Sequence, residues 1–180
     1  MKIIRLSDKG ITYEAPPFLA IRHRRADFEG FAKDYYVVEF KRRGGIVAVR
    51  EDRILMVRQY RLLTDDLSCE LPGGTIEDSE DAEVGLAREC EEETGILPKS
   101  LKPLLVYYPG LDNVDNRTAI YWTDDLSESR PFVANPREVC EIAWLPLEEC
   151  LGMVYQGRIL DAMSVTGLLG YALRQRVTRR

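Results

Sequence analysis

GTIEDSEDAEVGLARECEEETGI, residues 74–96, is the most strongly patterned segment of the chain. Nine acidic side chains and a single base, Arg88, lie between positions 77 and 93. When the segment is drawn as a helix at about 100° per residue, one narrow stripe begins apolar and ends acidic. Its members are Ala82, Leu86, Glu89 and Glu93. Because a buried carboxylate without a partner is energetically costly, the stripe predicts a bound cation, and we expect a divalent metal.

The predicted helix carries its carboxylates at a spacing that suits a hard cation. Glu89, Glu92 and Glu93 are three or four positions apart, so their oxygens can converge on one point. Mg²⁺ and Mn²⁺ prefer such oxygen ligands, completed by water and substrate phosphate. Arg88 is placed to orient a neighbouring carboxylate by a two-pronged hydrogen bond. The alternative is a solvated acidic helix, but there the acids would oppose the apolar stripe rather than continue it.

The ends of this helix are also marked in the sequence. Asp78 or Ser79 is the expected N-cap, and Gly95 is the expected terminator. The preceding segment, residues 71–74 (LPGG), predicts a loop whose backbone approaches its neighbours closely. A backbone carbonyl of this loop is a candidate further metal ligand.

Composition sets the broad class. The 180 residues are 45% hydrophobic and 31% charged, which is enough for one domain with a real core. A formal charge of −5 argues against general binding to nucleic acid or to a membrane surface. No stretch approaches about 18 apolar residues and no signal peptide is evident, so a cytoplasmic location is expected. Four cysteines without CxxC spacing and the single His23 argue against a zinc site.

The chain divides by pattern into two parts. Residues 1–43 contain brief β-type runs and no helical periodicity, which predicts a small antiparallel appendage. Residues 44–180 contain strands followed by helices, which indicates an α+β fold with a mixed sheet. The strands expected in the second part are 46–49, 54–60, 104–108, 119–122 and 140–145. One helix is expected from Pro146 to near Gly157, and a last one from Asp161 or Ser164 to Arg176.

Within the acidic segment, Gly74, Glu80 and then residues 88–96 (RECEEETGI) resemble the Nudix box, GX5EX7REUXEEXGU, where U is apolar. The wider chain resembles the branch of pyrophosphatases that act on ADP-ribose and nucleoside diphosphate sugars. Residues 57–61 (VRQYR), 70–74 (ELPGG) and 157–162 (GRILDA) carry that further likeness. The resemblance implies an α/β/α sandwich with a mixed sheet.

The resemblance also implies roles for individual residues. Glu89, Glu92, Glu93 and the Gly73 carbonyl would bind Mg²⁺, with Mn²⁺ as a substitute, while Arg88 orients Glu89 and Glu80 is structural. A carboxylate from a later loop would act as a base or as an extra metal ligand, and we prefer Glu138 to Glu141 because it lies nearer the loop. The expected substrate contacts are Arg58 and Arg61 for phosphate, and Phe31 and Tyr35 for the base. A homodimer is implied as well.

The function that follows is Mg²⁺-dependent hydrolysis of ADP-ribose or a nucleoside diphosphate sugar to a nucleoside monophosphate and a sugar phosphate. One alternative is a housecleaning hydrolase of nucleoside triphosphates or dinucleoside polyphosphates, which the N-terminal strands and the ELPGG segment disfavour. Another is a ligand-sensing module without turnover, which the intact box disfavours. The base and sugar stay open, because they depend on loops 109–117 and 130–137.

Overall fold

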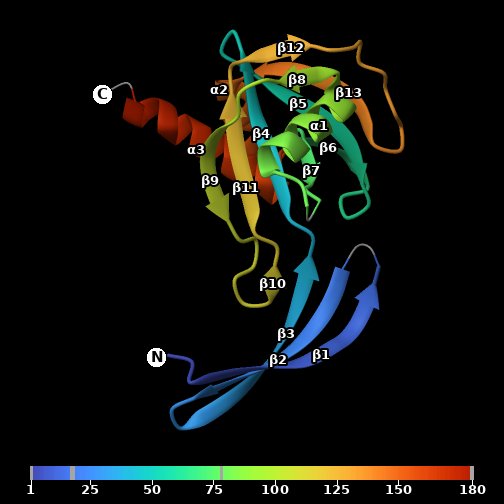
Figure 1. The fold of residues 1–180 in the computed structure, drawn as a ribbon. Helices are drawn as coiled ribbons and strands as arrows, with labels where there is room; N and C mark the ends of the chain where they lie inside the picture. The colour runs from blue at the N-terminus through green and yellow to red at the C-terminus, as the bar shows by residue number, and fades with distance from the viewer. Residues whose placement is uncertain (1, 17–18, 78, 179–180) are drawn as a thin grey trace. The chain divides into compact units, whose positions relative to one another are not determined.

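The computed structural model describes residues 2–16, 19–77 and 79–178, in two compact units (Figure 1). The first unit comprises the described residues up to Arg42 together with Tyr107–Arg117. The second comprises Arg43–Val106 and the described residues from Thr118 onward. The sequence pattern alone predicts residues 107–117 as part of the larger domain. They join the N-terminal strands because Val38 donates its N–H to Asn113 O at 2.8 Å and a short strand pairs beside it.

The first unit is a four-stranded sheet within the described residues, in the order β1-β2-β3-β10. Its strands are β1 (Arg5–Ala15), β2 (Leu19–Phe28), β3 (Phe31–Phe40) and β10 (Val114–Asp115). The first three pair antiparallel as predicted, and β10 is parallel to β3. The strands are longer than the brief runs expected, because ion pairs between strands offset the charged residues that interrupt the apolar pattern. Arg22 Nε, for example, donates to Glu39 Oε1 at 2.8 Å.

The second unit is built on a mixed sheet with the central order β13-β5-β4-β11-β9. These strands are β4 (Arg43–Arg50), β5 (Arg53–Arg61), β9 (Lys102–Tyr107), β11 (Thr118–Thr123) and β13 (Val139–Pro146). β11 runs parallel to β4, whereas β5 is antiparallel to both β4 and β13. β6 (Asp66–Glu70) pairs with β5, and β7 (Gly73–Thr75) pairs with β4. A separate ribbon pairs β8 (Ile96–Pro98) with β12 (Leu126–Glu128).

Helices cover both faces of this sheet (Figure 1). They are α1 (Ala82–Thr94), α2 (Leu147–Tyr155) and α3 (Ala162–Thr178) among the described residues. Two adjacent glycines of β4 show the layering, because successive strand residues face opposite sides. A Cβ at Gly44 would lie 2.9 Å from Leu86 of α1, and one at Gly45 would lie 2.8 Å from Met163 of α3. The predicted α+β class and its sandwich of layers are confirmed.

The two ends of α1 can be compared with the capping residues expected from the sequence. The N-cap is Asp81, whose carboxylate accepts the Glu83 N–H at 2.9 Å, so the expectation of Asp78 or Ser79 was early. Asp78 itself lies outside the described residues. At the other end Gly95 adopts the left-handed conformation with φ 74° and donates its N–H to Glu91 O at 2.9 Å, as predicted. In the part of the chain that the structure describes, no helix is suited to crossing a bilayer.

Candidate active site

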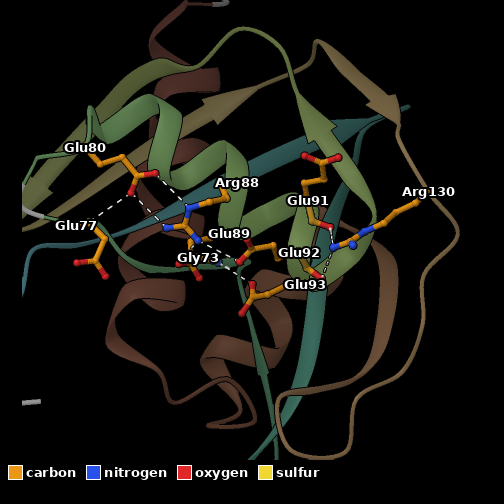
Figure 2. A network of polar contacts seen from close by, with 9 residues as sticks. All are labelled: Gly73, Glu77, Glu80, Arg88, Glu89, Glu91, Glu92, Glu93 and Arg130. Atoms are coloured by element: carbon orange, nitrogen blue, oxygen red, sulfur yellow. Dashed lines mark hydrogen bonds and ion pairs between the residues drawn. The ribbon is translucent and has the colours of Figure 1, made fainter. Parts of the chain in front are cut away.

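Arg88 is the centre of a polar network on α1 (Figure 2). Its Nε and Nη2 donate to Glu80 at 3.2 and 3.3 Å. Its Nη1 donates to Glu89 at 2.9 Å and to Glu92 at 3.1 Å. These bonds, first of all the one to Glu80, raise the pKa of Arg88 above its ordinary value. Arg88 therefore binds three carboxylates at once.

Glu89 lies between Arg88 and β7. A Cβ at Gly74 would collide with the Glu89 carboxylate, so only glycine lets the backbone approach this closely. The Glu89 side chain is 22% exposed. Burial raises the pKa of its carboxyl, and the hydrogen bond and charge of Arg88 oppose this only in part. The predicted close approach of the loop before the helix is therefore present at Glu89.

Glu93 meets the same loop one helical turn later. Its Oε2 accepts the N–H of Gly73 at 3.0 Å, across 20 positions of sequence (Figure 2). Burial raises the pKa of Glu93 to about 7, and the charges of Glu89 and Glu70 act in the same direction. The Gly73 hydrogen bond and, more weakly, Arg61 oppose that rise. A carboxyl with so high a pKa lacks adequate positive charge, which is the condition that a bound cation would relieve.

The carboxylates of Glu89, Glu92 and Glu93 are the type of ligand that suits a hard divalent cation, but their oxygens bind other groups in this structure. Within the described ranges, no three Asp, Glu, His or Cys side chains stand ready to hold a metal. The reason is that Arg88 binds Glu89 and Glu92 while the Gly73 amide binds Glu93. Glu92 is 55% exposed and is free to turn, so a cation can replace Arg88 as its partner without disturbing the core. Carboxylate oxygens are the protein ligands that Mg²⁺ prefers, completed by water and phosphate.

A cavity of about 430 Å³ adjoins the C-terminal end of α1 and is lined by residues of loop 130–138. Glu92 and Glu138 both line it. The Glu138 carboxylate accepts a hydrogen bond from Asn135 Nδ2 at 2.8 Å. Glu141 instead accepts from Arg58 at 3.0 Å and lines a different cavity. Of the two, Glu138 is therefore the one that lines the same cavity as Glu92.

The two strand arginines predicted to contact phosphate lie on opposite faces of β5. Leu55 belongs to the core beneath α1, so by strand alternation Arg61 faces α1 and Arg58 faces the other side. Arg58 lines a cavity of about 630 Å³ with Met153 of α2. Arg61 Nε donates to the buried Glu70 at 2.7 Å. The sheet therefore separates Arg58 from the acidic network, while Arg61 lies on the same side as that network.

The two predicted aromatic contacts, Phe31 and Tyr35, lie on β3 of the first unit. Phe31 is 49% exposed, and its ring stacks on Phe28 with centroids 4.8 Å apart. Lys33 Nζ lies 4.7 Å from the centroid of the Tyr35 ring. Their part in base binding stays a prediction.

Sequence reasoning missed the contacts that fix the start of loop 130–138. Arg130 Nη2 donates to the carbonyls of Glu91 and Glu92 at 3.2 Å each, at the end of α1 (Figure 2). Ser129 donates its N–H to Gly95 O at 3.0 Å. Figure 2 also shows the Glu91 side chain pointing away from Arg88. A base near a helix C-terminus is favourable in general, but nothing local in the sequence pairs Arg130 with this helix.

Comparison with solved structures supports this architecture. The structure titled "Crystal structure of ADP compounds hydrolase" matches with a TM-score of 0.81, over 99% of this chain and 98% of that one, at 16% identity. At that identity the likeness concerns the fold.

Comparison of sequences gives the family. A protein of Streptomyces rubellomurinus (strain ATCC 31215) named CMP-5'-(N-acetyl-N-hydroxy-3-aminopropyl)phosphonate hydrolase is 37% identical over 129 residues, 69% of this chain. The match spans 61% of that protein, less than two thirds of its length. The ADP-ribose pyrophosphatase of Bacillus subtilis (strain 168) is 28% identical over 76% of this chain and 77% of its own. The NUDIX domain model matches residues 40–161, and the chain therefore belongs to the NUDIX family of hydrolases.

Proposed function

We propose that the chain is a Mg²⁺-dependent hydrolase that cleaves the pyrophosphate of ADP-ribose or of another nucleoside diphosphate sugar. The products are a nucleoside monophosphate and a sugar phosphate. The observation that carries this proposal is the pair of partly buried carboxyls, Glu89 and Glu93, beside the Gly73–Gly74 backbone. Both have raised pKa values, and they share too little positive charge. Such a site is suited to a cation that also binds an anionic phosphate.

Each residue has a distinct part in this proposal. Glu89, Glu92, Glu93 and the Gly73 carbonyl hold the cation, for which Mn²⁺ can substitute. When bound, the cation neutralises charge on the pyrophosphate and activates water as a nucleophile. Arg88 keeps Glu89 oriented through the 2.9 Å hydrogen bond.

The remaining parts concern the proton and the substrate. Glu138 accepts the proton of the attacking water. It lines the same cavity as Glu92, which is one of the proposed metal ligands. Arg61 retains donors beyond those that bind Glu70 and is the proposed phosphate contact on the α1 side. Phe31 and Tyr35 are the proposed stacking surfaces for the base.

The names of two relatives support a substrate in which a nucleotide is joined to a second group through phosphorus. One relative is named for ADP-ribose, which agrees with the leading proposal. A second candidate substrate follows from the relative named for a CMP-linked phosphonate, because that protein is 37% identical over the matched region. In both compounds a nucleoside monophosphate is the product that an assay can detect.

The test is release of nucleoside monophosphate in Mg²⁺ from a panel of substrates. The panel contains ADP-ribose, GDP-mannose, UDP-glucose, a CMP-linked phosphonate, 8-oxo-dGTP and diadenosine polyphosphates. We expect the wild type to act best on a nucleoside diphosphate sugar. Glu92→Gln and Glu93→Gln should each lower kcat by at least about 100-fold, because the metal contributes several kcal/mol to the transition state.

Glu141→Gln is the matched control, since Glu141 pairs with Arg58 on the other side of the sheet. Its kcat should stay within about twofold of the wild type, as for ordinary surface changes. Activity confined to 8-oxo-dGTP or to the dinucleoside polyphosphates would replace the proposed substrate class. Equal rates for the wild type and Glu93→Gln on every substrate would remove the proposed mechanism.

We also propose a homodimer in a reducing cytoplasm. Exposed apolar side chains on the N-terminal sheet, among them Leu6, Ile11 and Tyr13, support a partner surface. The four cysteines are free, which agrees with a reducing compartment. Light scattering on the purified chain would show a monomer mass if the dimer proposal is wrong.

A further inference from the structure

The segment from Glu70 to Gly73 is fixed to the rest of the second unit at every residue. The Glu70 carboxylate is bound by Arg61, and the Pro72 carbonyl accepts the Ile46 N–H at 3.0 Å. The Gly73 N–H donates to Glu93. The remaining anchor is the Leu71 N–H, which donates to Ser164 Oγ at 2.8 Å across 93 positions of sequence. This anchor comes from α3, on the face of the sheet opposite α1.

Ser164 is fully buried, and both capacities of its hydroxyl are used. Ser164 Oγ accepts the Leu71 N–H and donates its own hydrogen to Asp161 Oδ2 at 2.7 Å. The Ser164 N–H also donates to Asp161 Oδ2, at 2.8 Å. The carboxylate therefore fixes the direction of the hydroxyl hydrogen, which leaves an oxygen lone pair aimed at Leu71.

The side chain of Leu71 rests on the same helix. Leu71 is 1% exposed, and a Cβ at Gly167 would lie 2.6 Å from Leu71 Cδ1. The Leu71 backbone is thus hydrogen-bonded to α3, and the Leu71 side chain packs against the same helix. Gly73 is only two residues further along the chain, so its position relative to Glu93 depends on these contacts between Leu71 and α3.

We propose that Ser164, oriented by Asp161, is a positioning residue for the metal site on the opposite face of the sheet. It acts through the Leu71 N–H, which places Gly73 against Glu93. Without the hydroxyl, the buried Leu71 N–H has no acceptor, and the segment shifts to find one. Gly73 then moves relative to Glu93, and the cation loses alignment of two of its proposed ligands. This inference rests on the proposed metal site, but it concerns residues that touch neither metal nor substrate.

The test is Ser164→Ala, read first by binding of Mn²⁺, from the electron paramagnetic resonance signal of the free ion. We expect the Mn²⁺ dissociation constant to rise about 10-fold or more, as for residues that orient metal ligands in other sites. With substrate, kcat at subsaturating Mg²⁺ should fall by a similar factor, while KM for the nucleotide changes less than about twofold. Asp161→Ala should have the same effect, and the double variant should be no worse than either single one.

Thr123→Val is the matched control, because Thr123 is also fully buried and its hydroxyl also accepts a backbone N–H, that of Asp125 at 3.0 Å. It should lower the melting temperature without changing Mn²⁺ affinity. Unchanged Mn²⁺ affinity in Ser164→Ala overturns the inference. If the wild type binds Mn²⁺ but hydrolyses nothing, the proposed reaction fails and the Mn²⁺ comparison still decides the role of Ser164. A wild type that binds no Mn²⁺ overturns both.

Discussion

The molecule contains two dense clusters of charge, and they differ in how well the charges cancel. On the N-terminal sheet, Glu39 accepts hydrogen bonds from Arg22 and Arg24, at 2.8 and 2.9 Å, and Asp8 accepts one from Arg22 at 3.0 Å, so two acids meet two bases. At α1, Arg88 donates to Glu80, Glu89 and Glu92, whereas Glu93 accepts the N–H of Gly73. The pKa of Glu39 is lowered by its arginines, first by Arg22, whereas burial raises the pKa of Glu93 to about 7.

The difference separates a structural charge cluster from a candidate site. Where arginines and carboxylates pair across strands, as Arg22 and Arg24 do with Glu39, the ion pairs hold neighbouring strands together. Where acids exceed bases in a partly buried place, the excess costs stability unless a cation binds. The number of charged residues alone does not distinguish the two regions. The two regions differ in the direction of the pKa shift, which is downward for Glu39 and upward for Glu93.

The largest expected effect comes from supplying the missing cation. Mg²⁺ at about 100 times its dissociation constant should stabilise the folded protein by about 2.7 kcal/mol, because it binds only the folded state. Thermal melts in Mg²⁺ and in EDTA at pH 8 measure this shift. Glu93→Gln should show a much smaller shift, since it lacks one proposed ligand. An equal shift in both proteins would mean that Mg²⁺ binds elsewhere.

A second effect is that removing the Glu93 charge should stabilise the metal-free protein. The pKa of its carboxyl is about 7 in the folded state, against an ordinary 4.5. Between pH 4.5 and pH 7, therefore, the folded state still holds a proton that the unfolded state has lost. The wild type therefore loses stability as pH rises from about 4.5 to about 7. Glu93→Gln does not titrate, and at pH 8 it should therefore be more stable than the wild type.

Urea unfolding in EDTA at pH 5 and pH 8 would measure that difference. The two proteins should converge toward pH 5, where Glu93 is mostly protonated. Glu83→Gln is a suitable control, because Glu83 is an exposed residue in the first turn of α1. A Glu93→Gln variant less stable than the wild type at pH 8 would contradict an uncompensated charge.

The smallest effect should appear in the balanced cluster and have the opposite sign. Glu39→Gln removes the shared partner of Arg22 and Arg24, so it should destabilise the protein by about 1 kcal/mol at pH 7. Because the folded pKa of Glu39 is lowered, its contribution is present above the ordinary value and disappears as pH falls through the folded value. Unfolding curves at pH 7 and pH 3.5 would test this. Destabilisation that grows as pH falls would show that the cluster is not balanced as described.

The spacing of residues along α1 predicted much of the candidate site. Glu89, Glu92 and Glu93 are neighbours on one helix, so their grouping needs only the helical period and the terminator Gly95. The α+β class and the antiparallel N-terminal strands followed in the same way from local pattern. The N-cap was placed early, because several acidic and hydroxyl residues precede the helix and each can serve as a cap. The lengths of β1 to β3 were underestimated, because their stabilising ion pairs join different strands.

By itself, therefore, the sequence determined the acidic face of α1, the class of fold and the excess of acid over base. The tertiary structure alone decided which neighbours those acids meet. It brought the Gly73 N–H to Glu93, bound Arg61 to Glu70, and placed Arg58 on the far side of the sheet. It also joined Ser164 to Leu71. The physical reason is that contacts within one helix follow from a fixed period, whereas contacts between segments depend on sheet register and packing of distant parts of the chain.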